Sequence, residues 1–212
     1  MISVFLESLT ATVVILVVSF LLANRSQANP LPENTVYVLK GDKADPLVIP
    51  SNAFWILKND KTERPGVGET ESSIEKKEGH ISMKGLLASL PGSWGRVGFS
   101  LMETAITKPI QKSLGLKFRV QGTEGLWASI LVKDRQANQP EGTLTFQWDF
   151  EIKPESTEFN APWSEFVPTI RGRKVSGFEL DLFSVKALAF QVSRSQQKKW
   201  YETVPLEFEL KL

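Results

Sequence analysis

The sequence contains no cysteine and a single histidine, His80. Without cysteine there is no disulfide, no thiolate nucleophile and no Cys-ligated zinc or iron–sulfur site. A Ser/His/Asp triad or a His-based metal site would have to be built around His80 alone, which lies where a turn leads into an expected strand. The sequence also lacks G-x-S-x-G, a P-loop and a strand followed by G-x-G-x-x-G. We therefore expect no enzyme activity, no cofactor and no metal.

An excess of charge of either sign is also missing. The 25 Lys and Arg residues nearly balance the 24 Asp and Glu residues, for a formal net charge of +1. Such a balance offers no broad basic surface for a polyanion, so nucleic acid is not an expected partner. The content of 42% hydrophobic and 23% charged residues is typical of a globular protein.

The apolar run at residues 2–23 has two interpretations. Its core from Ala11 to Ala23 suits the h-region of a signal peptide, and with Glu7 as its only charge the whole run reaches the ~20 residues of a spanning helix. The missing basic residue at its start favours a retained single-pass anchor in residues 1–28. A removed signal peptide, cleaved before Asn29, is the alternative.

The positive charges that follow this run bear on the side of the membrane. Arg25, Lys40 and Lys43 lie on its C-terminal side, which by the positive-inside rule favours a domain on the cytoplasmic, stromal or matrix side. We expect a single-pass membrane protein, in an organellar inner membrane or in a bacterial or plastid membrane.

The remainder is predicted to be all-β. Residues 29–50 contain four prolines around the run Thr35–Leu39, and this pattern is typical of a spacer with an edge strand. In residues 51–212 apolar and polar residues alternate, which predicts an antiparallel β-sandwich domain. No helix longer than a few turns competes with this prediction, and the best candidate for one is the short stretch near Met102 to Lys112. The alternating apolar sets are Leu114, Leu116, Phe118 and Val120; Leu126, Ala128, Ile130 and Val132; Leu144, Phe146, Trp148, Phe150 and Ile152; Leu188, Phe190 and Val192; and Leu206, Phe208, Leu210 and Leu212.

The polar residues between these positions form the candidate binding surface. A sheet face that carries amide, guanidinium and carboxylate groups beside an aromatic ring could bind sugar hydroxyls or a polar protein partner. A sheet face that is simply exposed to solvent has the same composition. Asp149 and Glu151 have the spacing of a glycosidase pair, but no apolar pocket is evident beside them, so an exposed sheet face is favoured. We predict that the following side chains share one surface: Lys117, Arg119, Gln121, Trp127, Ser129, Gln147, Asp149 and Gln191.

Several motifs of the chain resemble one family. GHISMKG, SWGRVGFSL, LGLKFRVQG, LWASILVKD, WSEFVPTIRGRKV and VKALAFQVS occur in this order between about Asn52 and Leu212. They are similar to the complex I intermediate-associated protein 30 family, whose domain is a jelly-roll sandwich of the galactose-binding-like type. The Trp and the Asn-Asp pair found early in the family's domain match Trp55 and Asn59-Asp60 of this chain. The Gly-rich turn that usually follows them in the family has a different sequence in this chain.

The most specific motif is FVPTIRGR, with the loop residues Phe166, Arg171, Gly172 and Arg173. Arg171 and Arg173 have two interpretations: a latch that binds carboxylates or carbonyls within the domain, which we favour, or a contact for a partner. The resemblance implies assembly or binding without a catalytic centre. The leading hypothesis is a membrane-anchored scaffold, similar to an assembly factor, that binds protein subunits of a respiratory or other membrane complex. The alternative is an exported carbohydrate-binding module whose polar face holds a glycan.

Overall fold

A computed structural model of the chain describes residues 36–40, 43–46, 54–64, 69–77, 80–88, 98–107, 109–110, 113–153, 155, 157–197 and 204–212. The predicted anchor or signal segment at residues 1–28 lies outside them. Within the described ranges, no helix is long and apolar enough to cross a membrane.

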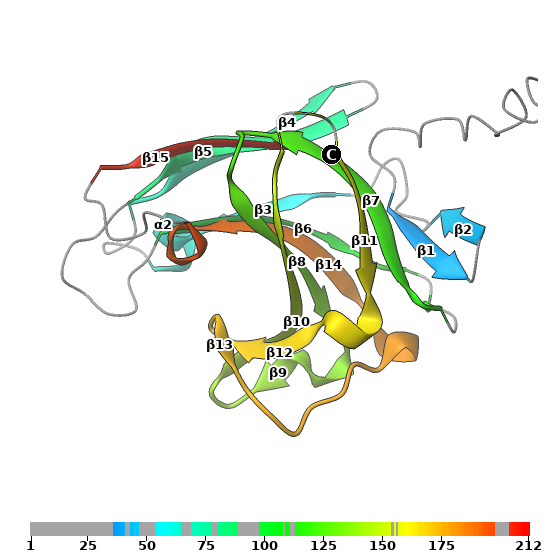
Figure 1. The fold of residues 1–212 in the computed structure, drawn as a ribbon. Helices are drawn as coiled ribbons and strands as arrows, with labels where there is room; N and C mark the ends of the chain where they lie inside the picture. The colour runs from blue at the N-terminus through cyan, green and yellow to red at the C-terminus, as the bar shows by residue number, and fades with distance from the viewer. Residues whose placement is uncertain are drawn as a thin grey trace, which may run out of the picture. The chain divides into compact units, whose positions relative to one another are not determined.

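Two antiparallel sheets face each other across one core (Figure 1). The first sheet contains, in order, β2 (Lys43–Pro46), β1 (Tyr37–Lys40), β7 (Gly115–Gly122), β15 (Leu206–Lys211), β5 (His80–Leu87) and β4 (Glu71–Lys77), with β11 (Thr157–Pro162) paired to β7. The second contains β13 (Arg173–Lys174), β12 (Val167–Ile170), β10 (Gly142–Glu151), β8 (Trp127–Lys133), β14 (Ala187–Ser193), β6 (Phe99–Ala105) and β3 (Ile56–Asn59), with β9 (Asn138–Gln139) paired to β10. The prediction of an all-β antiparallel sandwich is confirmed.

The helices among the described residues are short. They are α2 (Asp60–Glu63) and the 3₁₀ turns η1 (Arg135–Ala137), η2 (Trp163–Glu165), η3 (Leu182–Ser184) and η4 (Arg194–Gln196). The best helix candidate, near Met102, begins instead in a strand, because Met102 lies in β6 and is fully buried. Successive side chains of a strand point to opposite faces, so Met102 points into the core while Leu101 and Glu103 point to the outer face, and β14 and β3 pair with β6 on its two sides.

Aromatic rings from both sheets fill the centre of the core. Phe118 of β7 lies 5.4 Å from Phe150 of β10 and 5.3 Å from Phe190 of β14, in both cases edge to face. Full burial of such a side chain stabilises the fold by about 1.5–3 kcal/mol. Trp148, predicted to be core, packs against this cluster but is only half-buried, and its Nε1 donates to Glu165 Oε2 at 2.9 Å. Leu114 precedes its strand and is 62% exposed, so its assignment to the core is wrong.

The strand predicted in the spacer joins the first sheet. β1 pairs with β2 on one side and with β7 on the other, so β1 is an inner strand and β2 forms the edge. The spacer, predicted to precede the sandwich, therefore contributes two strands to it.

Asn59 and Asp60, at the end of β3, tie the two sheets together. The Asn59 side chain accepts from the Thr62 backbone N–H and caps α2, while its Nδ2 donates to Ser72 Oγ of β4 at 2.9 Å. Asp60 is buried, and its carboxylate accepts from the backbone N–H groups of Glu69 and Phe99 at 3.1 and 3.3 Å. These two residues of the family motif have structural roles in this chain.

Candidate functional site

The structure divides the predicted binding surface between the two sheets. Lys117, Arg119 and Gln121 lie on β7 of the first sheet, and the other five residues lie on β8, β10 and β14 of the second. Their neighbours Phe118 and Ile130 point inward to the same core, so the two polar sets point away from each other. The prediction of one shared surface is therefore wrong. On its own face, Lys117 pairs with Glu158 of β11 at 2.5 Å.

On the second sheet the predicted residues do come together. Asp149, Ser129 and Gln191 stand side by side on β10, β8 and β14. Asp149 Oδ1 accepts from Ser129 Oγ at 2.7 Å and from Gln147 Nε2 at 2.7 Å. Gln196 of η4 donates to the same carboxylate oxygen at 2.9 Å and also to the Ser129 hydroxyl. Much of the hydrogen-bonding capacity of this polar row is thus used within the domain.

Trp127, the predicted aromatic member of the surface, is half-buried at the start of β8. The Gln197 side chain holds this point of the strand, because its Oε1 accepts from the Trp127 N–H at 3.0 Å and its Nε2 donates to the Trp127 carbonyl at 2.9 Å. The backbone of this strand end is therefore fixed by a side chain from the segment after η4.

A charged group lies farther along the same outer face. Glu103 of β6 pairs with Lys58 of β3 at 3.1 Å and with Lys133 of β8. Burial acts to raise the pKa of Glu103, but the hydrogen bonds and charges of Lys133 and Lys58 outweigh it and hold the pKa below its ordinary value. Leu131 and Ala189, on neighbouring strands of this face, are almost fully buried. Less of this face is accessible to solvent than the alternation predicts.

The family motif loop forms a hairpin at the edge of the second sheet. Ile170 pairs with Arg173, which leaves Arg171 and Gly172 as a two-residue turn with φ values of 52° and 74°. Positive φ at both positions is the geometry of a type I′ turn. Arg171, Gly172, Arg173 and Lys174 are all exposed. The Arg171 side chain lies over Gly142, but neither arginine makes an ion pair or a side-chain hydrogen bond within the described part of the chain, so the described residues give the latch interpretation no support.

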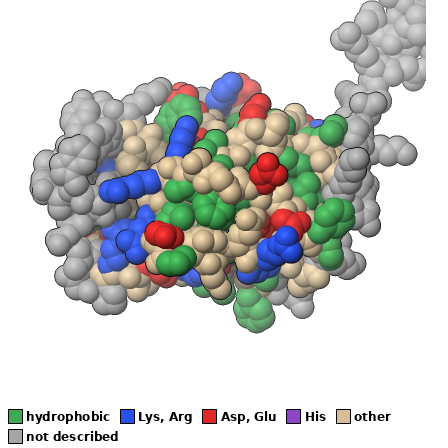
Figure 2. All heavy atoms as spheres, turned by 90° about the horizontal axis from the view of Figure 1, so that it is seen from below, with side chains coloured by type: hydrophobic (Ala, Val, Ile, Leu, Met, Phe, Trp, Pro, Cys, Tyr) green, Lys and Arg blue, Asp and Glu red, His purple; other side chains and the backbone are tan. Residues whose placement is uncertain are grey.

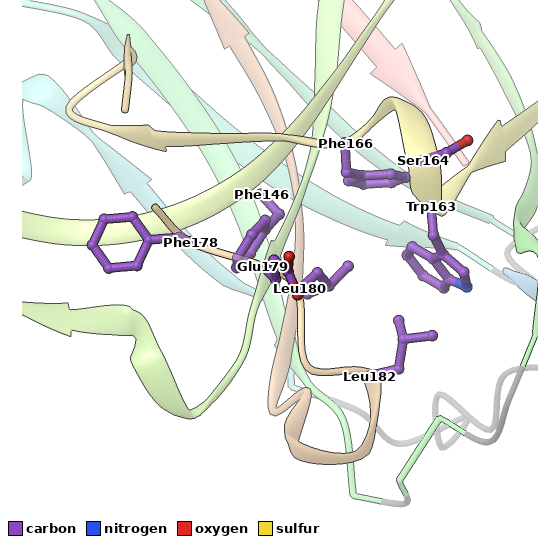
Figure 3. Close-up of a pocket in the computed structure, with 8 residues that line it drawn as sticks. All are labelled: Phe146, Trp163, Ser164, Phe166, Phe178, Glu179, Leu180 and Leu182. Carbon is purple, nitrogen blue, oxygen red and sulfur yellow. The ribbon is translucent and has the colours of Figure 1, made fainter. Parts of the chain in front are cut away.

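Phe166, at the other end of the motif, is buried and contributes to a hollow. Its ring lies 5.1 Å from that of Trp163, whose Nε1 donates to Ser113 Oγ at 2.9 Å. Figure 3 shows the hollow between these rings and the segment that follows the hairpin. It has a volume of about 340 Å³ and is lined by Phe146, Trp163, Ser164, Phe166, Phe178, Glu179, Leu180 and Leu182.

The segment at residues 177–182 separates this hollow from a second one. The second hollow, of about 620 Å³, shares Phe178, Glu179 and Leu180 with the first and is otherwise lined by more polar residues: Arg135, Gln136, Gly177 and Asp181. Buried Asp134 fixes the segment, because its Oδ2 accepts from the Asp181 N–H at 3.0 Å and from Gln136 Nε2 at 2.9 Å. Gln136 Nε2 also donates to the Glu179 carbonyl at 2.8 Å. Both hollows are therefore lined by a segment with fixed backbone positions.

Figure 2 views the domain from the side on which β9, β12 and the segment after β13 lie in Figure 1. Hydrophobic side chains gather in the middle of this face, and a group of Lys and Arg side chains lies to their left. We call the hairpin turn Arg171–Lys174 together with the first hollow the motif face. Sequence patterns did not reveal the hollow, because residues 175–182 have no regular period.

The described residues contain no group of three or more His, Asp or Glu residues that could hold a metal ion. His80 is half-buried at the start of β5, and the Asp149 carboxylate accepts hydrogen bonds from three side chains.

Comparisons with known proteins identify one matching family and similar solved structures. The family model described as Complex I intermediate-associated protein 30 matches residues 48–211. The fold is similar to that of a family 11 carbohydrate-binding module from Clostridium thermocellum, solved in complex with a beta-1,3-1,4-mixed-linked tetrasaccharide, at 13% identity and a TM-score of 0.52 over 84% of this chain and 95% of that chain. A family 11 module of a cellulosomal cellulase from the same organism covers 74% of this chain and 86% of its own length at 14% identity and a TM-score of 0.48. A search of curated proteins gave no match.

Proposed function

The chain belongs to the complex I intermediate-associated protein 30 family, and from this premise we propose that it is a non-catalytic binding scaffold that assists the assembly of a respiratory or other membrane protein complex. Its partners are protein subunits of that complex. Residues 2–23 anchor it in the membrane as a single pass, and the sandwich supplies the docking surface. An anchor confines the domain and its partners to one membrane and so raises their effective concentration.

The family membership carries this proposal, and the chemistry of the site supports it. The described residues offer a packed sandwich, a preformed hollow lined mostly by apolar residues, and exposed arginines. Aromatic residues and arginine are the types enriched in protein interfaces. The motif face therefore suits a protein partner better than a reaction.

The second candidate, an exported carbohydrate-binding module, draws on the fold alone. The polar row on the second sheet argues against it, because Asp149 and Ser129 already bind each other and Gln196. Sugar hydroxyls would have to displace these bonds, and the half-buried Trp127 offers little open ring area for stacking. The mature N-terminus separates the two candidates: Met1 favours the anchored scaffold, and Asn29 favours the exported binder.

Affinity capture tests the proposal directly. The tagged full-length chain is purified from membranes in mild detergent, and the co-purifying proteins are quantified by mass spectrometry against an untagged control. We expect subunits of one membrane complex to be enriched together. Two results together would support the exported module instead: no membrane subunit is enriched, and a soluble form of the chain that begins at Asn29 binds a glycan array.

A further inference from the structure

We propose that the motif face is the docking site for one kind of partner segment: an extended stretch of a subunit that places an apolar side chain in the hollow and acidic side chains on the turn Arg171–Lys174. This inference deepens the proposed function and rests on it, because it names the chemistry of the partner and the place where it binds.

The charges of the turn are the first argument. Many lysines elsewhere in the described residues have carboxylate partners, such as Lys61 with Glu71 at 3.0 Å and Lys84 with Glu75 at 3.4 Å. Arg171, Arg173 and Lys174, by contrast, are exposed and have no ion pair within the described residues. Three neighbouring cations repel one another, and an acidic partner would relieve this repulsion.

The backbone of the turn is the second argument. Arg171 has a φ of 52°, a conformation for which Asn, Asp or Gly is the favoured residue at this position of a type I′ turn. An arginine there costs stability relative to these residues. Its side chain lies over Gly142 but is exposed and has no carboxylate partner within the described residues. A charge-assisted bond to a carboxylate outside the domain would offset this cost.

The hollow supplies the apolar half of the site. Phe146 and Phe166 are buried at its floor, whereas Ser164 and Glu179 on its lining are exposed. A volume of about 340 Å³ accepts a leucine or phenylalanine side chain with room to spare. Because Asp134 holds residues 177–182 in place, binding there would need little ordering of the loop.

The distance between the hollow and the turn allows one partner segment to reach both. β12 runs from the hollow to the turn, and the five residue steps from Phe166 to Arg171 cover about 16 Å at ~3.3 Å per residue. An extended partner segment therefore needs its apolar residue and its acidic residues about five positions apart. Glu179 at the hollow disfavours an acidic residue beside the apolar one.

The test uses the full-length chain in membranes and two variants, each with its own control. Arg171→Gln/Arg173→Gln/Lys174→Gln removes the charges of the turn, and Lys153→Gln/Lys186→Gln, at two exposed lysines elsewhere, is its control. Ser164→Phe fills the hollow from an exposed position, and Ser176→Phe places the same ring on the exposed segment outside it. Thermal melts establish that each variant folds.

We expect the triple variant and Ser164→Phe each to lower the captured partner about tenfold or more, with wild-type capture falling as salt is raised, while both controls capture normally. If wild type captures subunits and the triple variant and Ser164→Phe capture them equally well, the inference is overturned and the proposed function stands. If wild type captures no subunit, the proposed function itself fails.

A photocrosslinker reports the chemistry of the partner. Benzoylphenylalanine replaces Phe183, which is 68% exposed beside Leu182 of the hollow. We expect crosslinked peptides that carry Asp or Glu about five residues from a large apolar residue. Adducts with lipid, or with peptides that lack acidic residues, would contradict the inference and make the motif face a contact of another kind.

Discussion

The hydroxyl of Ser129 donates a hydrogen bond of 2.7 Å to Asp149 Oδ1 across the paired strands β8 and β10. Ser129 is fully buried although it points away from the core. Gln147 and Gln196 donate to the same carboxylate oxygen. The outer face of the second sheet is thus held together by its own side chains rather than left free for a ligand.

Asp149→Ala tests this role. The change leaves the Ser129 hydroxyl and two amide groups without their acceptor, so we expect the free energy of unfolding to fall by about 1–3 kcal/mol. Chemical denaturation measures it, and Glu124→Ala, at an exposed loop carboxylate, is the control with an expected change within about 0.5 kcal/mol. Equal stability of the two variants would mean that the polar row is a solvated face after all.

Glu103 links stability to pH. Because its pKa is lowered in the folded state, its contribution is present above the unfolded value of about 4.3 and is lost as the pH falls through the folded value. Glu103→Gln should therefore cost about 1–2 kcal/mol at pH 7, since two lysines lose their carboxylate. The difference from wild type should shrink below about pH 4. Urea titrations at pH 7 and pH 3.5 measure both values, and a difference independent of pH would refute the ion-pair explanation. Glu207→Gln, at an exposed carboxylate of β15, should show no such change.

Trp148 belongs to the fold rather than to a binding surface. Its ring stacks on Phe150 at 5.9 Å and meets Phe118 edge to face at 6.2 Å. Because the ring is only half-buried, we expect Trp148→Ala to cost about 2–4 kcal/mol, somewhat below the loss for a fully buried ring. Arg119→Ala on the opposite sheet should leave the melting temperature within about 1–2 °C of wild type. Loss of partner capture by Arg119→Ala in a chain that melts normally would return the first sheet to consideration.

Arg171→Asn separates stability from binding in one residue. Asparagine accepts positive φ more readily than arginine, so the melting temperature should stay equal or rise slightly. Gly172→Val should instead destabilise the hairpin by about 1–3 kcal/mol, because a β-branched residue is strained at φ 74°. Partner capture should weaken in Arg171→Asn despite its stability. A clear drop in its melting temperature would mean that Arg171 does serve the fold.

The sequence predicted much of the fold and only part of the site. Strict alternation in residues 144–152 specified which side chains of β10 point inward, because the period of a strand is two. Alternation does not specify which sheet a strand joins, and this is why Arg119 and Ser129 were assigned to one surface although they lie on opposite sheets. Pairing of β8 with β10, and of β7 with β11, depends on contacts far apart in the chain.

The motif loop is a second case in which the sequence pattern did not determine the structure. The residues RGRK indicated a basic loop, but whether the arginines had partners inside the domain depended on the type I′ turn that exposes them. The hollow beside the turn is built from η2, β10 and the segment after β13, which are distant in sequence. Its existence follows from their packing and not from any local pattern.

The amount of the mature membrane complex in cells shows whether the chain acts in its assembly. Membranes from cells with and without this chain are solubilised in mild detergent and separated on native gels, and the complexes are identified by mass spectrometry. We expect the loss of the chain to lower the mature complex and to leave a smaller subcomplex of its subunits, and re-expression of the wild-type chain to restore the complex. Unchanged amounts of every membrane complex and of its subcomplexes, in cells shown to lack the chain, would contradict the proposal that the protein is an assembly scaffold.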